Sequence, residues 1–171
     1  MQLKVLYHGN CFDGCASAAL FTRFFTEREG ARLSEVRYLP LQHQAGDAFP
    51  PDAFDGDANA CVDFRFSASS SLHWWFDHHA SAFPRPEDRA AFERDRSGQK
   101  FWDPTAPSCT GFIARILAQR FGWRAAESST AAPDWHVGPA PTYKRYRPER
   151  RILKPTEKIL SDLVRGERAT A

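Results

Sequence analysis

The sequence predicts an α/β protein in which a parallel sheet is flanked by helices, and two observations lead to this prediction. Residues 2–8 read as a buried strand, which a glycine-containing loop connects to a helical pattern over residues 15–27. Strand, loop and helix in this order begin a β-α-β unit. Three predicted strands also end in ionisable side chains. Because the carboxyl ends of parallel strands share one edge of a sheet, where α/β proteins bind ligands, we expect these side chains to converge there.

Three more strands are predicted from short apolar or alternating stretches, at residues 34–42, 59–64 and 72–76. Pro40 cannot donate a ladder hydrogen bond, so it either ends its strand or places that strand at an edge of the sheet. The stretch 45–58 predicts a loop or a poorly formed helix, and residues 67–71 predict a turn.

The region after the fourth strand predicts two helices. Residues 83–100, which contain two prolines and many charges, indicate an exposed connection with a short helix over residues 87–94. Ser108 is a suitable N-cap for an amphipathic helix that runs from Cys109 to Phe121. Gly122 is well placed to end this helix.

The composition changes after Trp123, so we expect a domain at residues 1–122 and a diverged or truncated tail at residues 123–171, irregular apart from a helix at 155–165. From residue 141 onward, nine Lys and Arg stand against four Asp and Glu, a net charge of +5; the rest of the chain, with 14 against 17, carries −3. A basic tail on a mildly acidic body is either a solvated terminus or a contact for nucleic acid or an acidic surface.

The composition also narrows the class of protein. Apolar residues make up 42% of the 171 residues and charged residues 26%, which is typical of a soluble globular protein. No apolar stretch approaches the about 20 residues that a membrane span needs, so we expect no membrane partner. The first residues lack the pattern of a secretory signal. The four cysteines are scattered, which favours reduced thiols in a cytoplasmic protein (Cys11, Cys15, Cys61 and Cys109).

The strand ends predict a metal site. His8 ends the first strand and Asp13 lies in the loop that follows, Asp63 ends the third, and Asp77-His78-His79 ends the fourth. Mixed carboxylate and imidazole ligands suit a divalent transition metal such as manganese, iron or zinc. The alternative is that the strand ends coincide by chance and that the two adjacent histidines are ordinary surface residues.

These residues resemble the DHH family of phosphoesterases, which includes RecJ-type nucleases, hydrolases of cyclic dinucleotides and short oligonucleotides, and related pyrophosphatases. The resemblance covers roughly residues 3–121. Its motifs are HGNCFDGCAS from His8 to Ser17, the strand end Val62-Asp63, and Asp77-His78-His79. It implies a parallel α/β domain with a two-metal site, usually manganese, and a second, smaller substrate-binding domain after it.

The resemblance also implies roles for single residues. His8, Asp13, Asp63 and His78 are the expected metal ligands, with Asp63 bridging the two ions. Asp77 is expected to orient His78, and His79 to face the substrate phosphate. The implied reaction is hydrolysis of a phosphodiester or phosphoanhydride, in a nucleotide or short oligonucleotide, by a metal-activated water.

The sequence departs from the family pattern at two places. Cys11 stands where one carboxylate ligand is expected, so either Asn10 or Cys11 is the alternative ligand, and a thiolate favours zinc or iron over manganese. The family's later aspartate has only Asp134 as a counterpart, in a stretch that does not read as a strand end, and the neighbouring His136 reads as a loop residue. Residues 123–171 also do not read as the usual second domain.

Two functions therefore stay open. The first is a metal-dependent phosphoesterase domain. The second is a degenerate, inactive domain that binds nucleotides or nucleic acid, with the basic tail contacting the phosphate backbone. A pure metal-binding protein is a weaker third option, because the cysteines lack the paired short spacing of a structural zinc site. A sheet that ends early exposes an edge and an apolar face, which predicts poor solubility or a homodimer.

Overall fold

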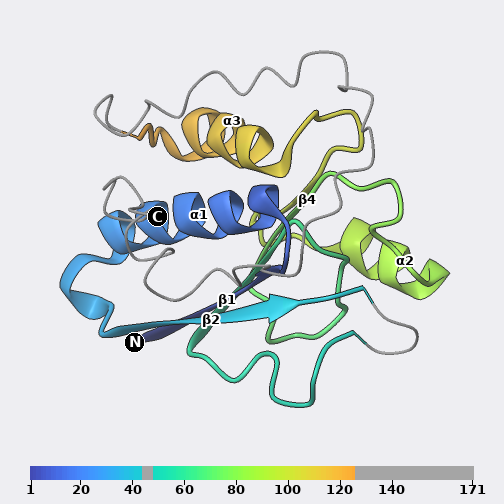
Figure 1. Ribbon diagram of the computed structural model, residues 1–171, viewed down its shortest axis with the longest axis horizontal. Helices are drawn as coiled ribbons and strands as arrows, with labels where there is room; N and C mark the ends of the chain where they lie inside the picture. Colours follow the sequence, from blue (N-terminus) through green and yellow to red (C-terminus); the bar gives the residue numbers. More distant parts are fainter. Residues whose placement is uncertain (44–47, 126–171) are drawn as a thin grey trace, which may run out of the picture.

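The computed structural model describes residues 1–43 and 48–125, which form a five-stranded, all-parallel sheet (Figure 1). The strands lie in the order β2-β1-β3-β4-β5. Their bounds are Gln2–His8 for β1, Glu35–Leu41 for β2, Ala58–Val62 for β3, Trp74–Asp77 for β4 and Lys100–Trp102 for β5. The sheet confirms the predicted α/β class, and its parallel pairing brings all five carboxyl ends to one edge.

Helices cover both faces of the sheet. α1 (Phe12–Glu29), which a short 3₁₀ helix (Gly30–Arg32) follows, and α3 (Cys109–Phe121) lie together on one face, and α2 (Pro86–Arg94) lies on the other (Figure 1). Ser108 caps α3, since its Oγ accepts a hydrogen bond from the Gly111 N–H, and Gly122 ends the helix in a left-handed conformation, both as predicted. No helix in the described part of the chain is long and apolar enough to cross a membrane.

The alternation of β1 divides the core into two parts. Leu3, Val5 and Tyr7 face α1 and α3, whereas Leu6 faces the side that carries α2. Both parts are rich in aromatic rings. Trp74 and Phe76 of β4 point to the first side, and Trp75 between them is fully buried on the second. Burying rings on both faces fixes the register of β4, and therefore the position of the polar residues at its end.

Most of the predicted elements agree with the structure. The four predicted strands and three helices are present, and Pro40 lies in the edge strand β2. Two predictions were wrong. The helix predicted over 15–27 begins at Phe12, and the stretch predicted as an exposed connection ends in a fifth strand, Lys100–Trp102, which pairs with β4. The helix predicted at 155–165 lies outside the described residues, and the expected homodimer stays a prediction.

Candidate metal centre

Asp63 lies at the centre of the polar cluster on the carboxyl edge of the sheet. It follows β3, the middle strand, and its backbone has a φ of 55°, a left-handed conformation that Asp adopts more readily than most residues. The carboxylate is buried, with 1% of the residue exposed. Among the described residues, neither of its oxygens has a hydrogen-bond partner. A buried carboxylate without donors is costly, so this position calls for a cation.

His78, directly after β4, presents an imidazole nitrogen to Asp63. Its Nδ1 lies 2.9 Å from the carbonyl oxygen of Ala106, which can only accept, so Nδ1 carries the proton and donates. Its Nε2 is then left to face Asp63, at 3.3 Å from Oδ1, although the contact lacks hydrogen-bond geometry. The Asp63 carboxylate raises the pKa of His78 to about 9, against the opposite effect of burial. The imidazole therefore binds a proton tightly when no other cation lies there.

His79 is held by Asp77. The Oδ1 of Asp77 lies 2.7 Å from Nδ1 of His79 and also accepts hydrogen bonds from the backbone N–H groups of both histidines. The hydrogen bond to Asp77 raises the pKa of His79. This differs from the expectation that Asp77 orients the ring of His78: the carboxylate fixes the ring of His79, and the Ala106 carbonyl fixes that of His78. Both arrangements leave Nε2 as the ring nitrogen that can act as a ligand or a donor.

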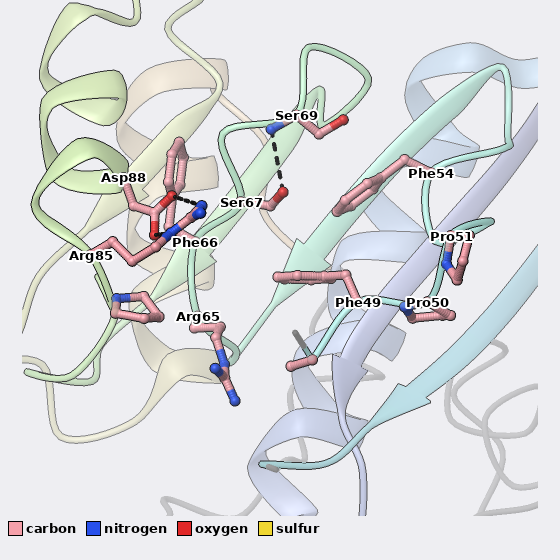
Figure 2. Close-up of a pocket in the computed structure, with 12 residues that line it drawn as sticks. Phe49, Pro50, Pro51, Phe54, Arg65, Phe66, Ser67, Ser69, Arg85 and Asp88 are labelled. Atoms are coloured by element: carbon pink, nitrogen blue, oxygen red, sulfur yellow. Dashed lines mark hydrogen bonds and ion pairs between the residues drawn. The ribbon is translucent and has the colours of Figure 1, made fainter. Parts of the chain in front are cut away.

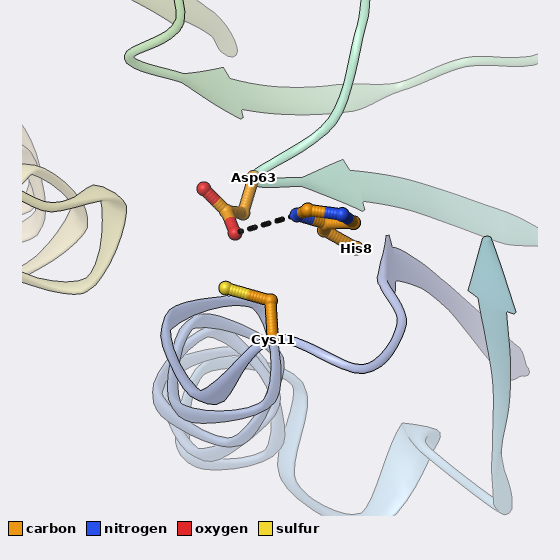
Figure 3. A group of neighbouring side chains, drawn as sticks. All are labelled: His8, Cys11 and Asp63. Atoms are coloured by element: carbon orange, nitrogen blue, oxygen red, sulfur yellow. Dashed lines mark ion pairs between the residues drawn. The ribbon is translucent and has the colours of Figure 1, made fainter. Parts of the chain in front are cut away.

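His8 and Cys11 form a second group with Asp63 (Figure 3). His8 ends β1, and its Nδ1 lies 3.7 Å from Oδ2 of Asp63 without a hydrogen bond. Cys11 is the N-cap residue of α1, and its side chain makes no capping hydrogen bond. Burial raises the pKa of the Cys11 thiol, and the carboxylates of Asp63 and Asp13 raise it further. Without a cation, this sulfur is a thiol.

Gly14 brings the start of α1 against the end of β1. A Cβ at this position would lie 2.2 Å from the carbonyl oxygen of His8, so no other residue fits without moving the backbone. Asn10, in the intervening loop, has a φ of 60°, which Asn tolerates well. Asn10 and Gly14 therefore allow the three residues between β1 and α1 to turn the chain and to place Cys11 beside His8.

Asp13 has a different set of contacts from the other predicted ligands. Its carboxylate accepts hydrogen bonds from the N–H groups of Cys109 and Thr110, at 2.7 and 2.9 Å, and from the Thr110 hydroxyl at 2.6 Å. Asp13 thus caps the N-terminus of α3, where a negative charge is favourable. Its Oδ2 still lies 3.7 Å from Nε2 of His78, at the border of the cluster.

His43 is a cluster residue that the sequence analysis missed. It lies two residues after β2, and its ring stacks on Phe64 with centroids 4.8 Å apart and meets the His8 ring edge-on at 4.7 Å. Burial lowers the pKa of His43, and the nearby His8 and Arg65 lower it further. The rule used for the other strands, an ionisable side chain just past a strand end, applies to His43 as well.

The structure therefore brings together nearly all the predicted site residues. Two sets of three possible ligands have donor atoms within 4.8 Å of one another, and both contain Asp63: one with His8 and Cys11, the other with His78 and His79. Asp77 and Asp13 support this cluster from its border. Asp134 and His136 lie outside the described residues. Comparisons of the chain with models of protein families, with curated proteins and with solved structures found no match.

Proposed function

We propose that this chain is a metal-dependent phosphoesterase of the DHH type, which hydrolyses a phosphodiester or phosphoanhydride in a nucleotide or short oligonucleotide. One observation carries the proposal. Asp63 is a buried carboxylate without hydrogen-bond donors, and it lies between His8 with Cys11 on one side and His78 with His79 on the other. A carboxylate shared by two ligand sets is what a bridging position between two ions requires.

The residues present fit such ions. Asp63 would be shared by the two ions. His8 would belong to the half of the site beside the start of α1, called the α1 half, and His78 to the half at the end of β4, called the β4 half. The oxygen and imidazole ligands favour manganese. Cys11, if it ligates as a thiolate, would favour zinc or iron in its half. When bound, such ions lower the pKa of a water molecule that attacks phosphorus and stabilise the charge on the phosphoryl oxygens.

His79 is suited to the substrate phosphate. Its Nδ1 is tied to Asp77, so Nε2 is the nitrogen that can donate to a phosphoryl oxygen. Asp77 also raises the pKa of the ring, which favours the charged form that donates from both nitrogens. Asp77 thus fixes the direction of the ring and the position of its proton without contacting the phosphate itself.

A second candidate is an inactive domain that binds nucleotides or nucleic acid. The position of Asp13 favours it, because three hydrogen bonds from the start of α3 occupy a carboxylate that the family uses as a ligand. A carboxylate has about four acceptor positions, so one is left for a cation, and the α1 half would bind its ion weakly. If the ion of the α1 half were lost, the domain would still bind a phosphate group but would not hydrolyse the ester.

Hydrolysis of bis-p-nitrophenyl phosphate by the manganese-loaded full chain tests the first candidate. We expect turnover that Asp63→Asn and His78→Gln both abolish. Asp103→Asn is the matched control, since this aspartate lies at the same edge, just past β5, and its carboxylate bonds to Thr105 and Arg115. Only its backbone N–H, which the substitution keeps, bonds to the cluster, at the Asp77 carbonyl. We expect this variant to keep wild-type activity.

Manganese binding without turnover on this ester or on any nucleotide would reject the enzyme and favour the binding domain. In that case, retention on DNA that falls with rising salt and disappears when residues 141–171 are deleted would identify the basic tail as the nucleic-acid contact.

A further inference from the structure

A cleft of about 580 Å³ opens on the face of the sheet that carries α2 (Figure 2). One wall is the segment 48–54, and the other is the start of α2 with the residues just before it. The volume lies within the range of about 300–1,000 Å³ that is typical of sites for small organic ligands. None of the residues assigned to the metal centre lines this cleft.

The cleft begins beside the metal centre. Asp63 is followed by Phe64 and by Arg65 and Phe66, which both line the cleft. Two residues of chain span at most about 7 Å. Phe64 also connects the two places laterally, since it stacks on His43 on one side and meets the ring of Phe49, a cleft residue, edge-on at 5.8 Å on the other. The cleft and the metal centre are therefore neighbours, with the buried Phe64 between them.

One wall of the cleft is aromatic. Phe49 and Phe54 are partly exposed, and their rings contact each other with centroids 5.3 Å apart. Phe66 also lines the cleft, but it is buried and lies on the other side, next to Arg85 and Asp88 (Figure 2). Planar bases stack on such rings whatever their sequence, because every base has a π-face.

The opposite wall holds a guanidinium in a fixed orientation. Asp88 is buried, with 2% of the residue exposed, and binds Arg85 through two hydrogen bonds of 3.0 and 2.8 Å. Such a two-point contact holds the guanidinium plane as well as its position. Glu87 lies 3.6 Å from the same group, so Arg85 is neutralised and acts as a flat surface for stacking. Arg65, nearer the centre, adds positive charge where the cleft and the cluster meet.

We propose that this cleft binds the nucleoside of a nucleotide phosphoester whose phosphate lies at the metal centre. The inference rests on the proposed function and adds a substrate site to it. Aromatic rings facing a fixed guanidinium suit a planar base, and the cation at the junction suits the adjoining phosphate. A simple phosphate or a sugar phosphate would gain nothing from either wall.

Two chromogenic esters with the same leaving group test the proposal: thymidine 5′-p-nitrophenyl phosphate and methyl p-nitrophenyl phosphate. We expect a KM for the thymidine ester that is lower by about 10-fold, as stacking of one base provides. Ser69→Trp, which adds a large side chain at a position that lines the cleft, should abolish this ratio, and so should Arg85→Ala. Ser70→Trp is the matched control, because Ser70 is exposed and does not line the cleft; it should keep the ratio.

A binding measurement decides the proposal even if neither ester is hydrolysed, which would reject only the proposed function. Calorimetric titration with thymidine 5′-monophosphate, deoxyribose 5-phosphate and inorganic phosphate, in the presence of manganese, should show tighter binding of the nucleotide alone. Ser69→Trp should bring the nucleotide to the level of the sugar phosphate. Equal binding of all three, no binding of any, or a preference that survives Ser69→Trp and Arg85→Ala would each overturn the proposal.

Discussion

The two halves of the cluster around Asp63 differ in how firmly their side chains are held. In the β4 half, a hydrogen bond fixes each imidazole: the Ala106 carbonyl holds His78 and Asp77 holds His79. In the α1 half, Nδ1 of His8 is buried and has no hydrogen-bond partner among the described residues. The Cys11 side chain makes no capping hydrogen bond. Ligands oriented by a second hydrogen bond bind metals more tightly. We therefore infer that the β4 half is prepared for an ion and that the α1 half needs rearrangement.

The largest effect is expected from the residue that both halves share. Asp63→Asn removes the charge but keeps the size of the side chain. Asn also tolerates the left-handed backbone at this position. We expect the affinity for manganese to fall by more than about 100-fold. Removing a residue that only hydrogen-bonds to a ligand costs less than this. Calorimetric titration of the chelator-treated chain measures this, with Asp103→Asn as control. Unchanged affinity would show that Asp63 is not the shared ligand.

A smaller effect on the affinity for manganese should distinguish the β4 half from the α1 half. We expect His78→Gln to lower the affinity of the tightest manganese ion by about 100-fold and His8→Gln to lower it by about 10-fold or less, because only the first ring is held by a second hydrogen bond. The same titration gives both values. Equal losses would remove the distinction between the halves, and a larger loss for His8→Gln would reverse it.

Asp13 should affect stability more than metal binding. Its carboxylate ties the start of α1 to the start of α3 through three hydrogen bonds, so Asp13→Ala should lower the free energy of unfolding by about 2 kcal/mol. Urea denaturation without metal measures this. Cys11→Ala, next to it in the same half, loses no capping hydrogen bond and should stay closer to wild type. Equal stability of Asp13→Ala and wild type would show that the link between the helices is unimportant.

The last effect concerns the pH dependence of stability. Asp63 raises the pKa of His78 from 6.5 to about 9 in the folded, metal-free chain, so the folded state binds this proton more tightly than the unfolded state. The stabilisation is complete below pH 6.5 and is lost as the pH rises through about 9. Thermal melting without metal should show a decline over this interval that is shallower in His78→Gln. Parallel declines in the two proteins would contradict the assignment.

Much of the fold could be predicted from local patterns, because its strands are short, apolar and bounded by turns. β5 was missed since its three residues, Lys100–Trp102, are only half-buried and follow a charged connection; only pairing with β4 makes them a strand. α1 begins earlier than its apolar pattern because Gly14 lets the helix approach His8 closely. Both differences depend on contacts between elements, which periodicity does not contain.

The site shows the same limit. Parallel pairing was enough to predict that His8, Asp63 and the residues after β4 would share one edge. It could not assign the hydrogen bonds among them, which depend on side-chain direction. The carbonyl that orients His78 comes from Ala106, and Asp13 bonds to α3, almost a hundred residues along the chain. These contacts are what distinguish the two halves.

The number of manganese ions bound by the chelator-treated full chain, counted by electron paramagnetic resonance, tests this asymmetry most directly. The account predicts one tightly bound ion per chain and a second that binds more weakly, with the tight ion lost in both Asp63→Asn and His78→Gln. No saturable binding, or two ions of equal affinity, would contradict it.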